Sequence, residues 1–270
     1  MTPGTHPPRP LLVRLVARDQ WVVAACLVLM CGLAWYWLWR SAAGAMPGLG
    51  AMSMSMAGMA SPGMRAGVWT LAYLGPTFAM WAIMMVAMML PSAAPVILLH
   101  AAFSRNGGGA ARLATFVFAA TYLLVWTAFA AVATIAQAIL VGRGLADAAT
   151  LALGNRAIVA GWLAATALYQ LSGLKNVCLS RCRAPASFLI QRWRPGNRGA
   201  VRMGVAHGVY CVGCCAFLML LLFVGGVMNL ALIFLITAAI LIEKYAPRTL
   251  HPRRLISTIL LIAAGALLFA

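Results

Sequence analysis

The chain is 270 residues long, with 64% hydrophobic and only 9% charged residues, and it carries a formal net charge of +17. Soluble domains contain roughly 25% charged residues, so this composition excludes an ordinary soluble protein and favours an integral membrane protein. Once the apolar runs are set aside, the sequence leaves no soluble domain of any size.

Apolar runs of about 18 residues or more predict transmembrane helices, because about 20 residues at 1.5 Å per residue cross the hydrocarbon core. We therefore expect an all-α, polytopic transmembrane helical bundle of about seven spans. In chain order, the spans are predicted at 20–39, 69–90, 114–141, 155–172, 203–224, 230–244 and 254–269. The first run could also be a cleaved signal peptide, and six spans would then remain.

The segments around these spans differ in character. Residues 1–19 are Pro-rich and expected to be loose, and residues 20–40 form a membrane anchor helix. Residues 41–68 are expected to be an outer Met-rich loop. Residues 69–270 form the transmembrane helical domain, which includes a basic inner loop at 173–202.

Prolines and glycines predict two chain breaks within that domain. Pro91 and Pro95 are expected to end the second span, because proline cannot donate a helical hydrogen bond. The turn at Gly225–Asn229 is very short, so the fifth and sixth spans are expected to form an antiparallel hairpin.

The basic residues indicate how the chain is oriented. With a cytoplasmic N-terminus, 16 of the 20 basic residues lie on the inner side, which fits the positive-inside rule. We therefore expect a multi-pass protein whose positive charge reflects topology and contact with the lipid bilayer, and no nucleic-acid partner.

A sulfur-rich stripe on the predicted fifth span is the strongest chemical signal. Cys211 and Cys214 lie on one helix face with His207, and Cys215 lies at the edge of that face. Thiolate and imidazole ligands suit a soft metal such as Cu(I), with Zn(II) less favoured. The alternative is that these cysteines are small apolar packing residues.

Methionines on the second span form a weaker signal. Met84 and Met88 lie in one row and Met85 and Met89 in the next, and thioether sulfur is also a soft ligand. The second and fifth spans run in opposite directions, so they could share one Cu(I) site. Methionine also fills gaps between helices, so packing alone remains an alternative.

Two further groups could bind metal. In the outer loop the candidates for metal uptake are Met52, Met54, Met56 and Met59. The alternative is that these methionines have no ligand role and belong to a low-complexity linker rich in Ala, Gly, Ser and Met. Cys178 and Cys182 lie among cations that favour thiolate, and they could form a secondary metal site, form a redox pair or have a structural role.

Glu243 and the adjacent Lys244 are expected to pair within the basic surface.

The sequence lacks the motifs of common enzymes. It has three acidic residues in all and no phosphate-binding loop or His-Glu-x-x-His motif. We do not expect an enzyme.

Three sequence motifs contain most of these candidate residues. The first is Trp81-x-x-Met84-Met85-x-Ala87-Met88-Met89-x-Pro91-Ser92-x-x-Pro95. The second is Tyr169-Gln170-Leu171-Ser172-x-Leu174-Lys175-x-x-Cys178-Leu179-x-x-Cys182-Arg183-x-Pro185. The third is His207-Gly208-x-Tyr210-Cys211-x-Gly213-Cys214-Cys215, followed by Gly226-Val227-Met228-Asn229-Leu230 and Glu243-Lys244. Together these motifs resemble a bacterial family of predicted metal-binding integral membrane proteins, often labelled copper chaperones. The pattern of that family has an aromatic residue after the paired cysteines, where this chain has Ala216.

These observations lead to one functional hypothesis and two alternatives. We expect a protein of the bacterial inner membrane that binds Cu(I) and hands it to or from a partner, such as a copper enzyme or another membrane subunit. The alternatives are a membrane thiol redox protein and a scaffold subunit that binds no metal.

Overall fold

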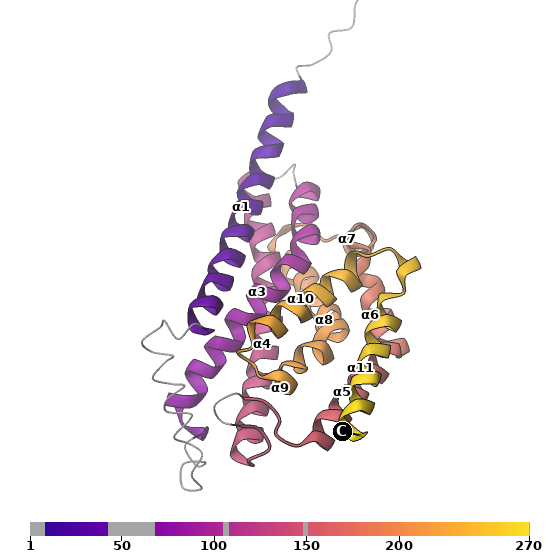
Figure 1. Cartoon of the computed structure of the whole chain (residues 1–270). Coiled ribbons are helices and arrows are strands. Elements are labelled where there is room, and N and C mark those ends of the chain that lie inside the picture. The colour runs from indigo at the N-terminus through magenta and orange to yellow at the C-terminus, as the bar shows by residue number, and fades with distance from the viewer. Residues whose placement is uncertain (1–8, 43–67, 105–107, 148–150, 270) are drawn as a thin grey trace, which may run out of the picture.

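The structure is a computed structural model that describes residues 9–42, 68–104, 108–147 and 151–269. Within these ranges the chain is a bundle of helices, and its β structure is a single bridge between Ala146 and Leu153. The predicted all-α architecture is confirmed (Figure 1).

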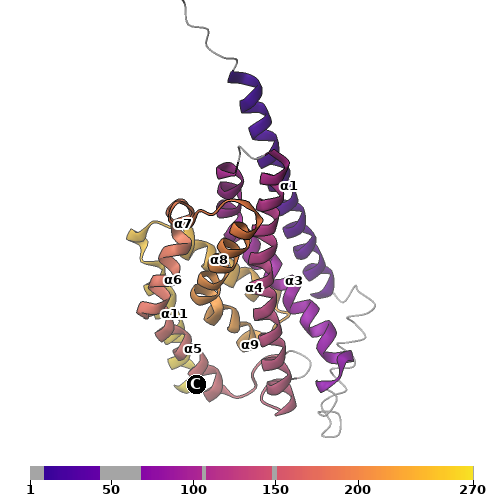
Figure 2. The ribbon, with the colours of Figure 1, turned by 180° about the vertical axis from the view of Figure 1, so that it is seen from behind.

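Long helices in the N-terminal half pack side by side. Helix α1 (Arg9–Ala42) packs on α3 (Leu71–Phe103), and α3 packs on α4 (Gly108–Gly142). Helix α4 then packs along α8 (Gly196–Leu220), so it joins the two halves of the bundle (Figure 2). Helix α1 begins at Arg9, within the segment expected to be loose. Pro10 stands in its first turn, where the missing backbone N–H costs no helical hydrogen bond.

Two glycines of α8 allow the close contact with α4. A Cβ atom at Gly204 would lie 2.7 Å from the Phe118 backbone oxygen, and one at Gly208 would lie 2.8 Å from the Val125 Cβ. Small residues one turn apart let two backbones approach closely, as is common between membrane helices. Helix α8 therefore packs closely on α4 in the two turns that come before Cys211.

The prediction that Pro91 ends the second span is wrong, because α3 continues to Phe103 through three internal prolines. Pro91 cannot donate to the backbone oxygen of Ala87, four residues earlier. The Trp35 indole of α1 donates to that oxygen at 3.1 Å instead. A neighbouring helix thus satisfies the freed carbonyl, which is how apolar helices tolerate proline.

Among the residues that the structure describes, five helices are long and apolar enough to cross a membrane. They are Gln20–Ala42, Leu71–Phe103, Arg112–Gly142, Gly196–Gly225 and Pro252–Phe269. The helices α5 (Arg156–Leu171) and α6 (Gly173–Arg183) are bent by 62° at the break between them, and they make a sixth span if this bent pair crosses the membrane as one unit. The predicted span at 230–244 is α10 (Leu230–Tyr245), whose 16 residues are short for a full crossing. These long apolar helices indicate a membrane-embedded protein.

The segment at 173–202, expected to be a basic loop, instead contains helices α6 and α7 (Pro185–Arg192) and the start of α8. The arginines suggested a solvated loop, but the opposite face of α6 is apolar. Leu179 and Cys182 on that face are buried, and α6 packs along α8. Phe188 of α7 is also buried and contacts the ring of His207.

Helix α9 (Leu222–Gly225) continues the span that begins with α8, and the chain turns back at residues 226–229 before it forms α10. Gly226 has a φ of 90°, a conformation that favours glycine. Asn229 caps α10 by accepting a hydrogen bond from the Leu232 amide at 3.2 Å. Lys244, near the end of α10, therefore returns to the level of Cys211 in α8. The C-terminal helix α11 (Pro252–Phe269) packs on α5.

Candidate metal centre

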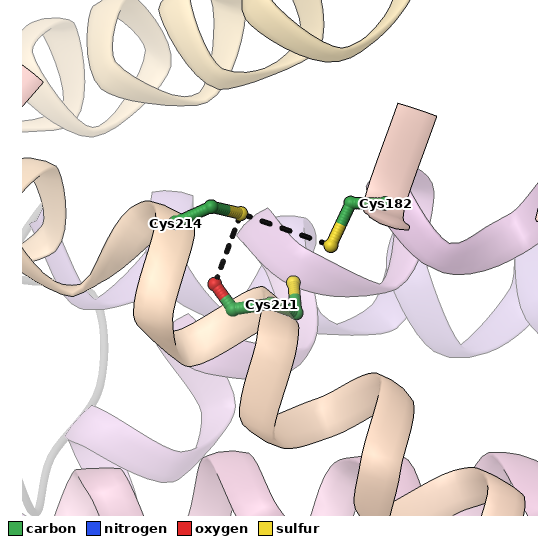
Figure 3. A group of neighbouring side chains, drawn as sticks. All are labelled: Cys182, Cys211 and Cys214. Carbon is green, nitrogen blue, oxygen red and sulfur yellow. Dashed lines mark hydrogen bonds between the residues drawn. The ribbon is translucent and has the colours of Figure 1, made fainter. Parts of the chain in front are cut away.

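Three buried thiols from two helices converge in the interior. The sulfur atoms of Cys182 in α6 and of Cys211 and Cys214 in α8 all lie within 4.8 Å of one another (Figure 3). The Cys214 thiol lies 3.8 Å from the Cys182 sulfur and 3.2 Å from the backbone oxygen of Cys211. We call this group the three-thiol cluster. A buried set of three sulfurs is a suitable donor set for a soft metal ion.

Local helix geometry explains how the cluster forms. Cys211 and Cys214 are three residues apart, so they lie on one face of α8. Gly213 faces α6, where an added Cβ would lie only 2.7 Å from the Cys178 sulfur. The absence of a side chain at Gly213 lets α6 pack close enough to bring Cys182 to the cluster. Cys178 contacts Gly213 and lies outside the three-thiol cluster.

Cys215 lies beside the cluster and is almost fully buried. Its sulfur is 3.2 Å from the Cys214 sulfur, but it is not within 4.8 Å of every member of the cluster. Cys215 therefore lies next to the cluster without belonging to it, and Cys182 supplies the third sulfur where the sequence had suggested Cys215.

A lysine and a tyrosine contact the cluster at Cys211. The Lys244 ammonium donates to the Cys211 sulfur at 3.1 Å and to the Ser92 hydroxyl at 2.9 Å. The Tyr122 hydroxyl lies 3.2 Å from the same sulfur and donates to the Met89 backbone oxygen at 3.2 Å. An ammonium in hydrogen-bond contact with a sulfur favours the thiolate form, which binds metal. The sequence placed neither residue at the thiols, because Lys244 was expected to pair with Glu243 and Tyr122 was not singled out.

The expected pairing of Glu243 with Lys244 is wrong. Glu243 pairs with Lys175 at 2.6 Å, and both side chains are buried. The Gln170 amide also donates to Glu243 at 2.7 Å, and Lys175 donates to the Gln170 side-chain oxygen. Adjacent residues on α10 point in different directions, so Lys244 faces the thiols and Glu243 faces α6.

His207 lies one helical turn before Cys211 and is 2% exposed. Its ring contacts the rings of Phe118, Tyr122 and Phe188. Neither ring nitrogen has a hydrogen-bond partner among the described residues. Burying an unpaired polar group is costly, so these nitrogens are suited to a ligand that the protein itself does not supply.

The methionines of α3 are all buried. Met84, Met85, Met88 and Met89 are at most 1% exposed. The Met89 backbone oxygen accepts hydrogen bonds from Tyr122 and Ser92, so this end of the row reaches the surroundings of Cys211. The ligand role of the four thioethers stays a prediction. Met52, Met54, Met56 and Met59 lie outside the described residues.

A family model matches most of this chain. The family model of PpoB2, described as a copper chaperone, matches residues 78–268. This range includes all three thiols of the cluster, His207, Tyr122 and Lys244. No curated protein and no solved structure matches the chain.

Proposed function

Because this chain belongs to the PpoB2 copper chaperone family, we propose that it binds Cu(I) at the three-thiol cluster and passes it to a partner protein. The observation that carries the proposal is the convergence of three buried sulfurs within 4.8 Å. Thiolate sulfur is a soft donor that suits Cu(I) better than the hard oxygen ligands preferred by Mg²⁺ or Ca²⁺. The family's description as copper chaperones and the three buried cysteines therefore support the same proposed site.

The surroundings of the cluster suit a metal that is held and then released. Lys244 supplies a positive charge beside Cys211, which limits the net negative charge of the buried thiolates. Cys215 and His207 are adjacent donors that can replace a cluster ligand during handover. Met84 and Met88 are proposed as supporting ligands, with Met85, Met89 and Cys178 as secondary ones.

Transfer in a membrane requires a donor side and an acceptor side. We propose a bacterial inner-membrane location with a cytoplasmic N-terminus, because this orientation places most basic residues inside. The outer methionines would then collect copper, and the acceptor would be a copper enzyme or another membrane subunit.

Reporter fusions test this orientation. Alkaline phosphatase fused after Gly63 should be active, and the same reporter fused after Asn197 should be inactive. The reverse pattern would contradict this orientation.

Competition with a colorimetric Cu(I) chelator tests the metal site. The purified protein should compete for one Cu(I) per chain, and a Cys182→Ser/Cys211→Ser/Cys214→Ser variant should lose this affinity by orders of magnitude, because serine is neither soft nor ionised near neutral pH. Cys26→Ser is the matched control, since Cys26 lies on α1 outside the cluster. Equal affinity in the triple variant and the control would refute the site.

Thiol redox chemistry is a second candidate function. The Cys214 sulfur lies 3.2 Å from the Cys215 sulfur and 3.8 Å from the Cys182 sulfur, so it has two thiol neighbours with which it could form a disulfide. A measured disulfide potential that controls activity in cells, together with no Cu(I) binding by the reduced protein, would favour this candidate.

A further inference from the structure

A basic groove lies beside the metal centre, between α6, α7 and α8. It has a volume of about 660 Å³. Its lining includes Arg181, Arg192, Arg194 and Arg202, together with Gln191 and Met203. We call it the arginine groove. Four guanidinium groups face this one hollow, so the groove is a site for a negatively charged ligand.

The polar contacts shown for the groove arginines are with neutral partners. Arg181 donates to the Gln191 side-chain oxygen at 2.7 Å. Arg192 donates to the Tyr210 hydroxyl at 3.0 Å and lies over its ring at 5.5 Å. The lining contains no acidic residue. Because these contacts do not neutralise the guanidinium charge, the groove repels a bare Cu⁺ ion and attracts an anion.

The groove and the three-thiol cluster share the same two helices. In α6, Arg181 lines the groove and the next residue, Cys182, belongs to the cluster. In α8, Met203 lines the groove, and His207 and Cys211 follow at intervals of one turn on the same face. Eight residues of helix correspond to roughly 12 Å. The groove therefore lies close to the cluster along the contact of α6 with α8.

Two soft or borderline donors occupy the path between groove and cluster. Met203 is 1% exposed and offers a thioether at the base of the groove. His207 follows with two buried ring nitrogens that have no partner among the described residues. Cu(I) can move along such donors by stepwise ligand exchange, since thioether and imidazole both bind it.

We propose that copper from the inner side reaches the cluster through the arginine groove, as an anionic complex of Cu(I) with small thiol molecules, so the groove is a loading route separate from the outer methionines. This inference rests on the proposed function. Two copper–sulfur bonds of the complex break and two bonds to cysteine thiolates of the cluster form. The protons of the protein thiols leave with the released small thiols, and copper stays in the +1 state throughout. No oxidant or reductant is needed.

Transfer kinetics with two copper donors test the groove. One donor is the Cu(I) complex of glutathione, which is anionic, and the other is the acetonitrile complex, which is cationic. Electrostatic steering raises association rates by roughly 10- to 1,000-fold and weakens with salt. In the Arg194→Gln/Arg202→Gln variant, loading from glutathione should slow at least about tenfold, while loading from acetonitrile should not slow and the equilibrium affinity should not change.

The matched control is Arg198→Gln/Arg254→Gln, which removes the same charge from exposed residues outside the groove. This control should load from glutathione at the unaltered rate. Met203→Leu should slow loading while leaving the final affinity within a few-fold of the starting protein.

Three outcomes would overturn the proposal. Copper loading of the groove variant could slow equally with both donors, or loading of the control variant could slow as much as that of the groove variant. Alternatively, the groove variant could lose co-purified anionic phospholipid while its loading rate stays unchanged, which would make the groove a lipid headgroup site. Failure of the unaltered protein to bind Cu(I) at equilibrium is a different result and would refute the proposed function.

Discussion

Two buried lysines near the metal centre have very different partners. Lys175 is fully buried and forms an ion pair with Glu243 at 2.6 Å. Lys244 is also buried, but it donates to the Cys211 sulfur and the Ser92 hydroxyl. The first lysine belongs to a self-contained ion pair, and the second places its charge beside candidate metal ligands. The comparison teaches that the partner of a buried charge indicates its role better than its burial does.

The Lys175–Glu243 ion pair and the contacts of Lys244 are connected through the same helices. Lys175 lies in the first turn of α6, the helix that carries Cys182. Glu243 directly precedes Lys244 in α10. The Lys175–Glu243 pair therefore joins α6 to α10 and helps fix the distance between Cys182 and Lys244. We expect variants of the pair to act mainly on stability and variants of Lys244 to act mainly on metal binding.

The largest stability effect is expected at the ion pair. Lys175→Met leaves the Glu243 charge buried without its partner, which costs about 3–5 kcal/mol. The double variant Lys175→Met/Glu243→Gln should recover much of this loss, because no unpaired charge remains. Denaturation of the purified protein in detergent measures both. Equal losses in the single and double variants would show that the pair matters through packing and not through charge.

Lys244→Met should weaken Cu(I) binding by roughly 10- to 150-fold, because a hydrogen bond to a charged group contributes about 1.5–3 kcal/mol. It should destabilise the fold less than Lys175→Met does, since it leaves no carboxylate unpaired. Ser92→Ala is the control, because it removes the other acceptor of the Lys244 ammonium and keeps the contact with Cys211. Chelator competition measures the affinities, and an unchanged affinity in Lys244→Met would remove Lys244 from the site.

Tyr122→Phe should have a smaller effect. It removes one neutral hydroxyl contact with the Cys211 sulfur, worth about 1 kcal/mol or roughly fivefold in Cu(I) affinity. Tyr73→Phe is a matched control, because Tyr73 is a buried tyrosine whose hydroxyl accepts a hydrogen bond from Gln137 away from the cluster. If both variants bind Cu(I) equally well, Tyr122 only packs against the thiol.

The smallest effects are expected for Met84→Leu/Met88→Leu. Volume and apolarity are nearly kept, so stability should change by less than about 1.5 kcal/mol. Cu(I) affinity should fall measurably if either thioether is a ligand, but far less than on loss of the thiols. Unchanged affinity in the same chelator competition would assign both methionines to packing.

Sequence patterns predicted the long apolar helices and two of the three thiols of the cluster. The apolar runs gave the long helices, and the three-residue spacing placed Cys211 and Cys214 together. Cys182 could not be placed in the cluster, because its segment is rich in arginine and its burial depends on contact with α8 through Gly213.

Tertiary contacts also explain the remaining errors. The continuation of α3 past Pro91 depends on the Trp35 indole of a different helix, which no local pattern reveals. Lys244 follows Glu243 in sequence, so an ion pair between neighbours was the simplest expectation. Its true direction is set by the packing of α10 against α3 and α8. Tyr122 carries no sequence signal beyond being a tyrosine in an apolar helix.

X-ray absorption spectroscopy of the Cu(I)-loaded protein tests the central claim most directly. The account predicts a first shell of sulfur ligands that loses sulfur in the Cys182→Ser variant, because Cys182 belongs to the cluster with Cys211 and Cys214. The Cys26→Ser spectrum should match that of the unaltered protein. A shell of nitrogen and oxygen, or a sulfur shell that is unchanged when Cys182, Cys211 and Cys214 are all replaced by serine, would contradict the account.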